Sequence, residues 1–320
     1  MARVNFSESV SMAMGSLWSN KLRTFLTLLG IIIGVLTIIA VVSIIQGLNN
    51  YVYTQFAFFG ANDFTVSKFS MTGGSFSEYR EMMKRKNLTL DEMRLLRRKC
   101  QSCELIGASV STTRTVKFSN QYLKDVEIRG VTHLDHMIGS VVELDRGRHI
   151  LKEDDDHSRY VCIIGADIVE KLFPYLDPLG KRIKVGPHNF LVTGIGEQKG
   201  KLLGMSQDNY VRIPITTFHK IYGSRRSINI NVHTKSQEQM EIAQEEVRTI
   251  LRSKRHLSFK DKDDFSFVSS ETFIQMYRAA TSSIYFAMIA ISSIALFVGG
   301  IVIMNIMLVA VTERTKEIGI

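Results

Sequence analysis

Two long apolar runs frame a polar middle in this 320-residue chain. The first extends from Phe25 to Ile45 and the second from Ile284 to Val311, and neither contains an Asp, Glu, Lys or Arg. As helices they would measure about 31 Å and about 42 Å, against about 30 Å of bilayer hydrocarbon. A helix satisfies its own backbone hydrogen bonds where water is absent. The pattern therefore predicts two transmembrane helices, at 24–46 and 284–311.

The stretch before the first apolar run has the period of an amphipathic helix. Its apolar residues recur at helical spacing, and Asn5 followed by Glu8 is typical of a helix start. Joined to a membrane span, such a helix is expected to lie in the cytoplasmic membrane interface, within residues 1–23. The predicted interface anchors are Phe6, Val10, Met14, Leu17 and Trp18.

Basic residues flank the outer ends of the two apolar runs, whereas residues 47–60, which follow the first run on its inner side, carry none. By the positive-inside rule, both ends are expected in the cytoplasm and residues 47–283 outside it; long loops are translocated whatever their charge. A cleaved signal peptide is the alternative for the first apolar run. That run is longer than a usual signal core, and no small-x-small cleavage site clearly follows it. The basic residues on which the orientation depends are Arg3, Lys21, Arg23, Arg314 and Lys316.

The middle region mixes strand and helix patterns, so we expect an α+β domain there. Thr89 to Glu92 is typical of a capping box that opens a helix, and Gly186-Pro187 of a hairpin turn. Gly73-Gly74-Ser75 indicates a flexible loop. The expected strands are 63–69, 110–118, 126–131, 161–164, 183–185, 190–195, 211–215 and 228–233. The expected helices are 90–99, 167–173 and 237–253.

Composition and charge limit the kinds of partner that the protein is expected to bind. The net charge is +9, most of it in the predicted outer domain. Anionic lipid headgroups or an acidic partner are candidates for that charge, although a solvated surface is the commoner explanation. Nucleic acid is not expected as a partner, because basic residues are not interleaved with aromatic ones.

The candidate chemistry is sparse. Cys100 and Cys103 form a C-x-x-C that closes a predicted helix, whereas a thioredoxin-like redox centre needs this motif to open one; a structural disulfide or idle thiols are the expected roles. Cys162, in an apolar strand, is expected in the core. Two groups contain residue types that bind metals, but neither has the spacing of a recognised site, so we expect no metal. These are His133 with His136, and Asp154, Asp155, Asp156 and His157.

No ATPase phosphate-binding loop is present in the sequence. No Ser/His/Asp or paired-carboxylate pattern stands out, although such partners can be scattered along a chain. The segment 194–200 mimics a dinucleotide fingerprint but has one residue too many, so it indicates a turn after a strand. We expect no enzyme activity and no cofactor in this chain.

The end of the second apolar run carries a family resemblance. Gly299-Gly300, Asn305 and Met307, followed by the charged segment Thr312 to Ile320, resemble the same region of MacB-like (FtsX-like) ABC transporter permeases. Further segments are similar to that family over nearly the whole chain. They are 19–24, 128–131, 165–173, 177–181 and 192–195.

The resemblance implies roles for named residues. The segment 312–320 would begin a cytoplasmic coupling element that touches the ATPase through Glu313, Arg314, Lys316 and Glu317. The outer domain would have two lobes, one of them inserted at about 126–225. Small residues would allow close packing of the membrane helices, within the chain or across a dimer, at Gly30, Gly34, Gly299 and Gly300.

The resemblance also implies partners. The permease would act as a homodimer or heterodimer in the lipid bilayer of the inner membrane, with an ABC ATPase subunit that holds ATP and Mg, and with a periplasmic adaptor protein in some systems. ATP hydrolysis inside would move the outer domain, a mechanism called mechanotransmission, for export or extraction of a peptide, antibiotic or lipoprotein-type substrate. The family's permeases continue through two further membrane helices, so half of the membrane domain is expected here. The rival is a membrane-anchored binding or signalling protein without an ATPase.

Overall fold

The computed structural model describes residues 18, 21–57, 60, 62–70, 76–138, 143–202 and 204–318. Contacts divide the chain into two compact units. One consists of residues 1–52 with 277–320, and the other, called here the outer unit, of residues 53–276. The predicted amphipathic helix lies, apart from Trp18 and the end of its range, outside the described residues.

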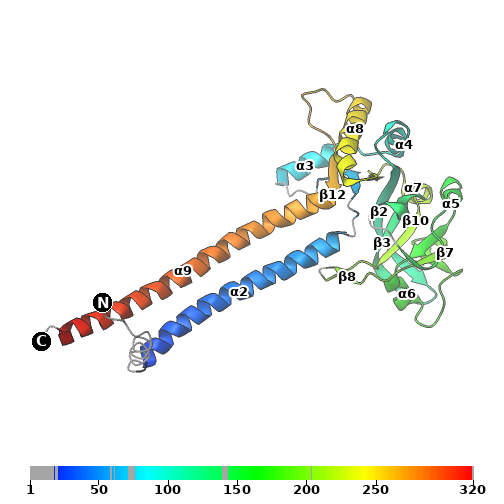
Figure 1. Cartoon of the computed structure of the whole chain (residues 1–320). Coiled ribbons are helices and arrows are strands. Elements are labelled where there is room, and N and C mark those ends of the chain that lie inside the picture. Colours follow the sequence, from blue (N-terminus) through cyan, green and yellow to red (C-terminus); the bar gives the residue numbers. More distant parts are fainter. Residues whose placement is uncertain are drawn as a thin grey trace. The chain divides into compact units, whose positions relative to one another are not determined.

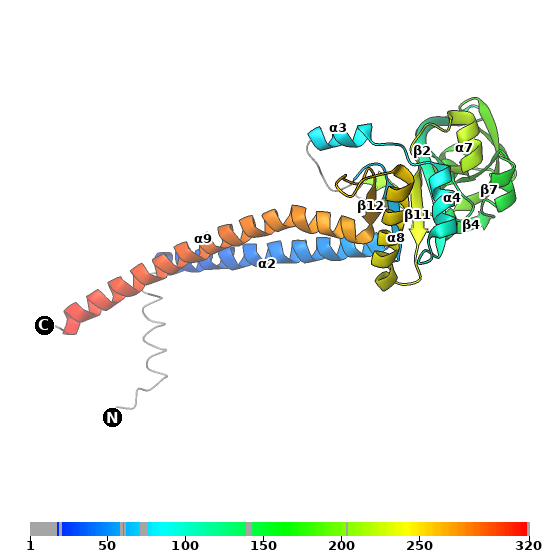
Figure 2. The same cartoon turned by 90° about the horizontal axis from the view of Figure 1, so that it is seen from above.

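The first unit is built from helices α2 (Lys21–Ala57) and α9 (Ser270–Ile318), which lie side by side in both views (Figures 1 and 2). Apolar side chains along both helices are exposed, which suits lipid or another helix better than water. Within the described chain, Ser270–Ile301 is the one helical stretch long and apolar enough to cross a membrane. Val35–Asn50 is a shorter apolar stretch, so the first span stays a prediction.

Helix α9 begins at Ser270, well before Ile284, where the apolar run that predicted it starts. The hydroxyl of Ser269 accepts a hydrogen bond from the Thr272 amide, and the Ser269 amide donates to the Thr272 hydroxyl. This reciprocal cap satisfies free amides at the start of the helix. The first turns of α9, through Met276, therefore belong to the outer unit, and one unbroken helix of 49 residues leads on into the first unit.

The outer unit is organised around a ten-stranded mixed sheet in the order β12-β1-β11-β2-β3-β10-β5-β7-β4, with β6 paired to β2 and β7. Most neighbours are antiparallel; β3–β10 and β5–β7 are parallel. The small hairpin β8–β9 stands apart from this sheet. The strands are β1 (Asp63–Ser67), β2 (Leu105–Phe118), β3 (Gln121–Val131), β4 (Leu144–Gly147), β5 (Val161–Ile164), β6 (Arg182–Val185), β7 (His188–Gly196), β8 (Lys201–Leu202), β9 (Met205–Ser206), β10 (Tyr210–Pro214), β11 (Asn229–His233) and β12 (Ser266–Ser269).

Helices cover the apolar face of this sheet. Helices α4 and α8 pack together, with α4 against β2, whereas α6 packs against β3 and β7, and α7 against β3 and β10. At Gly130 on β3 the backbone approaches α7 so closely that a Cβ would lie 2.5 Å from Phe218. The helices are α3 (Phe76–Lys84), α4 (Leu90–Lys99), α5 (Lys152–Asp156), α6 (Ala166–Leu172), α7 (Ile215–Tyr222) and α8 (Gln237–Arg255), with a 3-10 turn η1 (Asp135–Met137).

Strand alternation separates two kinds of surface. On β1, Phe64 and Val66 are buried in the main core, while Thr65 and Ser67 point to the opposite face. The same alternation holds on β2 and β11, because successive side chains of a strand point to opposite faces. The first half of the sheet therefore has one face in the core and one polar face.

Several sequence expectations are confirmed. Thr89 caps α4, its hydroxyl accepting from the Glu92 amide while the Glu92 carboxylate accepts from the Thr89 amide. The β6–β7 hairpin turns at Gly186-Pro187, and Cys162 is fully buried.

Other expectations need correction. The strand predicted at 211–215 is β10, which begins at Tyr210 and ends at Pro214, because Ile215 starts α7. Strand β2 begins at Leu105, before the predicted 110, because its first residues pair with β11. The sequence pattern did not predict helices α3 and α7, which are short and flank irregular or strand-like segments.

The region predicted as an inserted lobe, about 126–225, supplies β10, β5, β7, β4 and β6 together with most of the paired part of β3. Strand β2 pairs with β11 through its first residues and with β6 near its end. A continuous sheet thus joins the two predicted lobes.

A buried charge network ties α8 to the start of α4. The guanidinium of Arg255, 3% exposed as a side chain, donates to the Glu92 carboxylate at 2.7 Å and lies 2.8 Å from a carboxylate oxygen of Asp264. Burial lowers the pKa of Arg255, but the hydrogen bonds to Glu92 and Asp264 outweigh it, so this pKa lies above its ordinary value. The charged pair is therefore the stable state in the folded protein.

We predict that Arg255→Ala lowers the free energy of unfolding of the outer unit by about 3–5 kcal/mol, because it leaves the Glu92 carboxylate buried without its partner. Arg94→Ala, which removes an exposed pair with Asp91, should cost about 1 kcal/mol at most. Pulse proteolysis in urea on the detergent-solubilised chain measures both. Equal losses for the two variants would contradict a structural role for the buried network.

Candidate functional site

The residues predicted to couple to an ATPase lie in the last turns of α9. Helix α9 continues without interruption through Glu313, Arg314, Lys316 and Glu317 and ends at Ile318. Thr315 lies between Arg314 and Lys316, and its hydroxyl donates a hydrogen bond to the Val311 carbonyl of the same helix at 2.7 Å. The charged segment is thus a direct continuation of the apolar helix.

The glycines predicted for helix packing lie on the two long helices. Gly30 and Gly34 are on α2, and Gly299 and Gly300 are on α9. A Cβ added to Gly300 would meet no described atom within 4 Å. The two helices also line an apolar hollow of about 230 Å³, formed by Ile38, Val41, Val42, Tyr285, Met288, Ile289, Ser293 and Leu296. Packing of the glycines against a partner stays a prediction.

Of the predicted interface anchors, Phe6, Val10, Met14 and Leu17 lie outside the described residues. Trp18 is 68% exposed, and the Lys21 ammonium lies 5.1 Å from its ring centroid. An exposed Trp beside a Lys suits a membrane interface.

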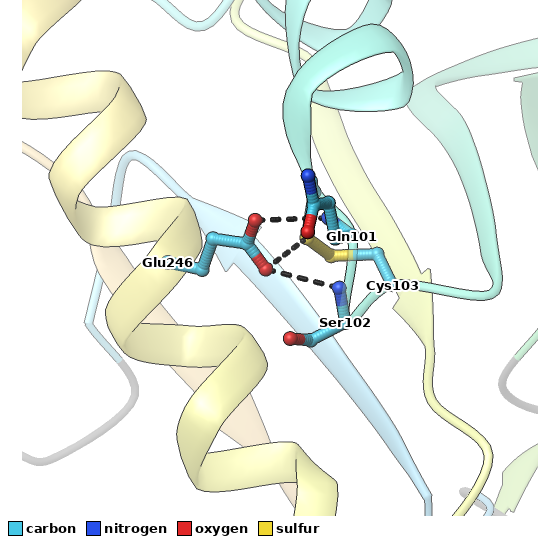
Figure 3. The surroundings of a disulfide bond; sticks show 5 residues. Gln101, Ser102, Cys103 and Glu246 are labelled. Carbon is cyan, nitrogen blue, oxygen red and sulfur yellow. Dashed lines mark hydrogen bonds between the residues drawn. A yellow bond between two sulfur atoms is a disulfide. The ribbon is translucent and has the colours of Figure 1, made fainter.

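The two cysteines of the C-x-x-C motif form a disulfide (Figure 3). Cys100 caps the end of α4, and the loop that follows binds the Glu246 carboxylate of α8. The amides of Gln101 and Ser102 donate to the two Glu246 carboxylate oxygens at 2.9 and 3.0 Å. Although burial raises the pKa of Glu246, these hydrogen bonds hold it below its ordinary value. The loop therefore joins α4 to α8 through hydrogen bonds from its backbone amides to the Glu246 carboxylate.

The acidic and histidine groups that the sequence offers as metal ligands have other partners. The Asp154 carboxylate accepts from Arg148 and Arg159, and the Asp155 carboxylate accepts from Thr216. In the part of the chain that the structure describes, no group of three His, Cys, Asp or Glu side chains is placed to hold a metal ion.

One candidate site in the outer unit is a hollow that the sequence did not predict. A hollow of about 340 Å³, called here the polar hollow, lies on the face of the sheet opposite α4 and α8. Apolar side chains also line it, among them Phe69, Ile138, Val268 and Phe273. Its short hydroxyl and amide side chains are Thr65, Ser67, Ser109, Ser111, Asn229, Asn231, Ser269 and Ser270.

A hydrogen-bonded network holds part of this lining in place. The Asn231 amide accepts from the Thr65 hydroxyl at 3.1 Å and donates to the Ser109 hydroxyl at 3.1 Å. It also donates at 2.8 Å to the carboxylate of Asp135, which stands on η1. The other Asp135 oxygen accepts from Arg212 at 3.2 Å. Both carboxylate oxygens of Asp135 are therefore occupied by protein donors.

Two arginines stand side by side in the lining. Arg129 and Arg212 are direct partners on the parallel strands β3 and β10. Arg212 is 6% exposed, lies over the Tyr210 ring, and donates to Asp135 through Nη1. Its Nε and Nη2 have no hydrogen-bond acceptor among the described residues, whereas Arg129 directs Nε and Nη2 to Glu127. Guanidinium donors thus remain at the hollow.

Burial makes this charge arrangement costly. Burial raises the pKa of Asp135, and the nearby Arg212 and Arg129 oppose that rise. Burial lowers the pKa of Arg212; the charge of Asp135 opposes this fall, and the like charge of Arg129 adds to it.

Another residue of the lining, Asp63, has its carboxylate 2.6 Å from Nδ1 of His233.

Three imidazoles adjoin Arg212 in a small gap next to the hollow. The rings of His136 and His149 stack with centroids 4.2 Å apart, and Nδ1 of His136 lies 2.7 Å from the His133 carbonyl oxygen. Burial lowers the pKa of His149, and the charges of His136 and Arg212 lower it further. Burial and Arg97 lower the pKa of His133.

Comparison with known proteins finds relatives that are similar over nearly the whole chain. The family profile of the MacB-like periplasmic core domain matches residues 24–250. The macrolide export ATP-binding/permease protein MacB of Neisseria gonorrhoeae is 30% identical over 316 residues, covering 98% of this chain and 47% of that protein. The pyoverdine export ATP-binding/permease protein PvdT of Pseudomonas savastanoi pv. phaseolicola is 29% identical over 317 residues, covering 98% and 46%. The chain thus spans about half the length of these relatives.

Solved structures share the fold of the outer unit. The periplasmic region of MacB from Actinobacillus actinomycetemcomitans matches with a TM-score of 0.57 at 20% identity, covering 71% of this chain and 97% of that one. The extracellular domain of the transporter YknZ from Gram-positive bacteria matches with a TM-score of 0.51 at 18% identity, covering 65% and 100%. Identity at this level supports a common fold and says nothing about ligands.

We predict that the stability of the outer unit falls as the pH drops below about 6.5, because folded His149, whose pKa is lowered, resists a proton that the unfolded chain accepts. His149→Phe keeps a ring in the stack but cannot be protonated, so its free energy of unfolding should decline less between about pH 7.5 and about pH 5.5. His157→Phe, at an exposed imidazole, should decline as the parent does. Pulse proteolysis across this pH range would contradict the assignment if the parent and His149→Phe had the same slope.

We also predict that the double variant Cys100→Ser, Cys103→Ser folds and keeps transport activity. Loop closure over so short a segment contributes about 2 kcal/mol at most, and the Glu246 hydrogen bonds to the loop amides remain. The parent protein treated with a reducing agent should lose the same stability. A folded double variant without transport would show that the disulfide has a role in the transport cycle itself.

Proposed function

Because this chain belongs to the family of MacB-like ABC transporter permeases, we propose that it is the permease part of a transporter driven by ATP hydrolysed outside these 320 residues. It would sit in the inner membrane, with residues 47–283 in the periplasm and both ends in the cytoplasm. Its work would be mechanotransmission, in which ATP-driven movement of the membrane helices moves the outer unit.

The observation that carries this proposal is the continuity of α9. One helix of 49 residues, about 73 Å long, begins at the end of β12 and finishes in the charged segment. Its apolar part is long enough to cross a bilayer, and its last turns contain Glu313, Arg314, Lys316 and Glu317. A continuous helix is a stiff connection, because each residue is tied by hydrogen bonds to the turns around it. Such a connection suits transmission of movement better than a flexible tether does.

The partners follow from the same proposal. The charged segment would dock on an ATPase domain, and ATP and Mg would be bound there. A second permease, identical or related, would pack through Gly30, Gly34, Gly299 and Gly300, where small residues allow close helix approach. A periplasmic adaptor protein is a further proposed partner of the outer unit.

The substrate class is proposed from the relatives. Two of them are named for the export of macrolides and of pyoverdine. We propose an exported amphiphilic substrate of this general kind, with peptides and lipoproteins as the wider range.

The coupling test exchanges charge in the last turns of α9. We predict that Glu313→Lys with Glu317→Lys, made in the native complex, reduces ATPase stimulation and copurification of the ATPase at least about tenfold. Misplaced charge against a partner surface costs several kcal/mol, and about 1.4 kcal/mol already corresponds to a tenfold change. The matched control is Glu238→Lys with Glu241→Lys, the same change of charge on the exposed side of α8.

The control should bind and stimulate the ATPase as the parent does, and both variants should express equally. If the α9 variant also behaves as the parent, the charged segment is a solvated helix end. The rival function, a membrane-anchored binding or signalling protein without an ATPase, would then be favoured.

A further inference from the structure

We propose that the polar hollow of the outer unit is a binding site for a small amphiphilic organic carboxylate, which Arg129 and Arg212 recognise through guanidinium donors. The site is built within residues 53–276 and does not depend on the coupling of α9 to an ATPase.

The size of the hollow fits a small ligand. Its volume of about 340 Å³ lies within the range of sites that hold small molecules, about 300–1,000 Å³.

Arg212 has guanidinium N–H groups that no described residue accepts. Arg212 is more than nine-tenths buried, yet only Nη1 is directed to Asp135. The Asp135 carboxylate is already shared with Asn231, so it offers little to the remaining N–H groups of Arg212. Nε and Nη2 of Arg212 are not among the fully buried side-chain atoms that lack a partner, so both are accessible to water or to a ligand that replaces it. A carboxylate is the acceptor that matches the planar fork of a guanidinium.

Neighbouring Arg129 strengthens this anion preference. It is the direct strand partner of Arg212, and its side chain is 35% exposed, so a ligand can reach it. Glu127 accepts from Nε and Nη2, which leaves Nη1 for a ligand. Two guanidinium groups on adjacent strands can share one carboxylate, because neighbouring strands are only about 4.8 Å apart.

The rest of the lining defines the body of the ligand. Ser111 and Asn229 offer a hydroxyl and an amide, which pair with amide or hydroxyl groups. Phe69 and Phe273 offer aromatic surface to an apolar portion. This combination disfavours an inorganic anion as the best ligand, since an inorganic anion would use the arginines alone. Because Phe273 stands on α9, a bound molecule would touch the first turns of that helix.

The test uses N-acetyl-phenylalanine, which carries a carboxylate, an amide and an aromatic ring, and its neutral counterpart N-acetyl-phenylalaninamide. Binding to the purified full chain in detergent is measured by isothermal titration calorimetry and ligand-observed NMR. We expect saturable binding of the acid, and at least about tenfold weaker binding of the amide, because a charge-assisted hydrogen bond is lost. Inorganic phosphate should compete only weakly.

Two variants and two controls locate the site. Arg129→Gln should weaken acid binding about tenfold, whereas Arg114→Gln on β2, outside the hollow, should not change it. Ser111→Phe should fill the hollow and abolish binding, whereas Thr113→Phe, further along the same strand and outside the lining, should not. Circular dichroism checks that each variant folds.

Several results would overturn the proposal. They are no saturable binding of the acid, equal binding of acid and amide, displacement by phosphate at equal concentration, or acid binding that survives both Arg129→Gln and Ser111→Phe. None of these depends on ATPase stimulation, so failure of this site and failure of the proposed transporter function are separate outcomes.

Discussion

The register of β2 is the constraint on which the outer unit depends. This strand of 14 residues pairs with β11 at its start, with β3 along most of its length, and with β6 near its end. A slip of one residue would turn Ala108 and Val110 out of the core and bring Ser109 and Ser111 into it, because strand side chains alternate between faces. The core under α4 and α8 and the polar hollow on the other face are thus fixed by the same pairing.

Electrostatics explains why the polar face is not merely a solvated surface. A solvated sheet face usually carries long charged side chains that reach into water. Here most of the polar side chains are short, and the charged side chains of Asp135 and Arg212 are nearly enclosed. Removing two charges from water is unfavourable, and replacing a buried pair with apolar groups is often neutral or stabilising. Stability alone therefore does not explain the Asp135–Arg212 ion pair. The remaining guanidinium donors of Arg212, which are able to bind a ligand, account for it better.

Much of the outer fold could be predicted because its signals are local. The Thr89 capping box, the Gly186-Pro187 turn and the burial of Cys162 each depend on a few neighbouring residues, and all three are confirmed. Helix α7 could not be predicted in the same way, since its first residue, Ile215, continues the apolar run of β10. Periodicity alone does not separate a short buried strand from the helix that follows it. The hollow could not be predicted either, because its residues meet only in three dimensions: Arg212 is 77 residues from Asp135 in the chain, and Asn231 is 96 residues from it.

Continuity between the hollow and α9 has a mechanical consequence for the proposed function. The cap formed by Ser269 and Thr272 fixes the start of the helix to the end of β12, and Phe273, the next residue, lines the hollow. A helix rises about 1.5 Å per residue, so even a movement of that size along its axis would break the cap or carry Phe273 away from its neighbours. A hydrogen-bonded cap resists this by about 1 kcal/mol, comparable to the binding energy that a few good contacts supply. Occupancy of the hollow and the position of α9 are therefore expected to influence each other, and by linkage the coupling free energy is the same in both directions.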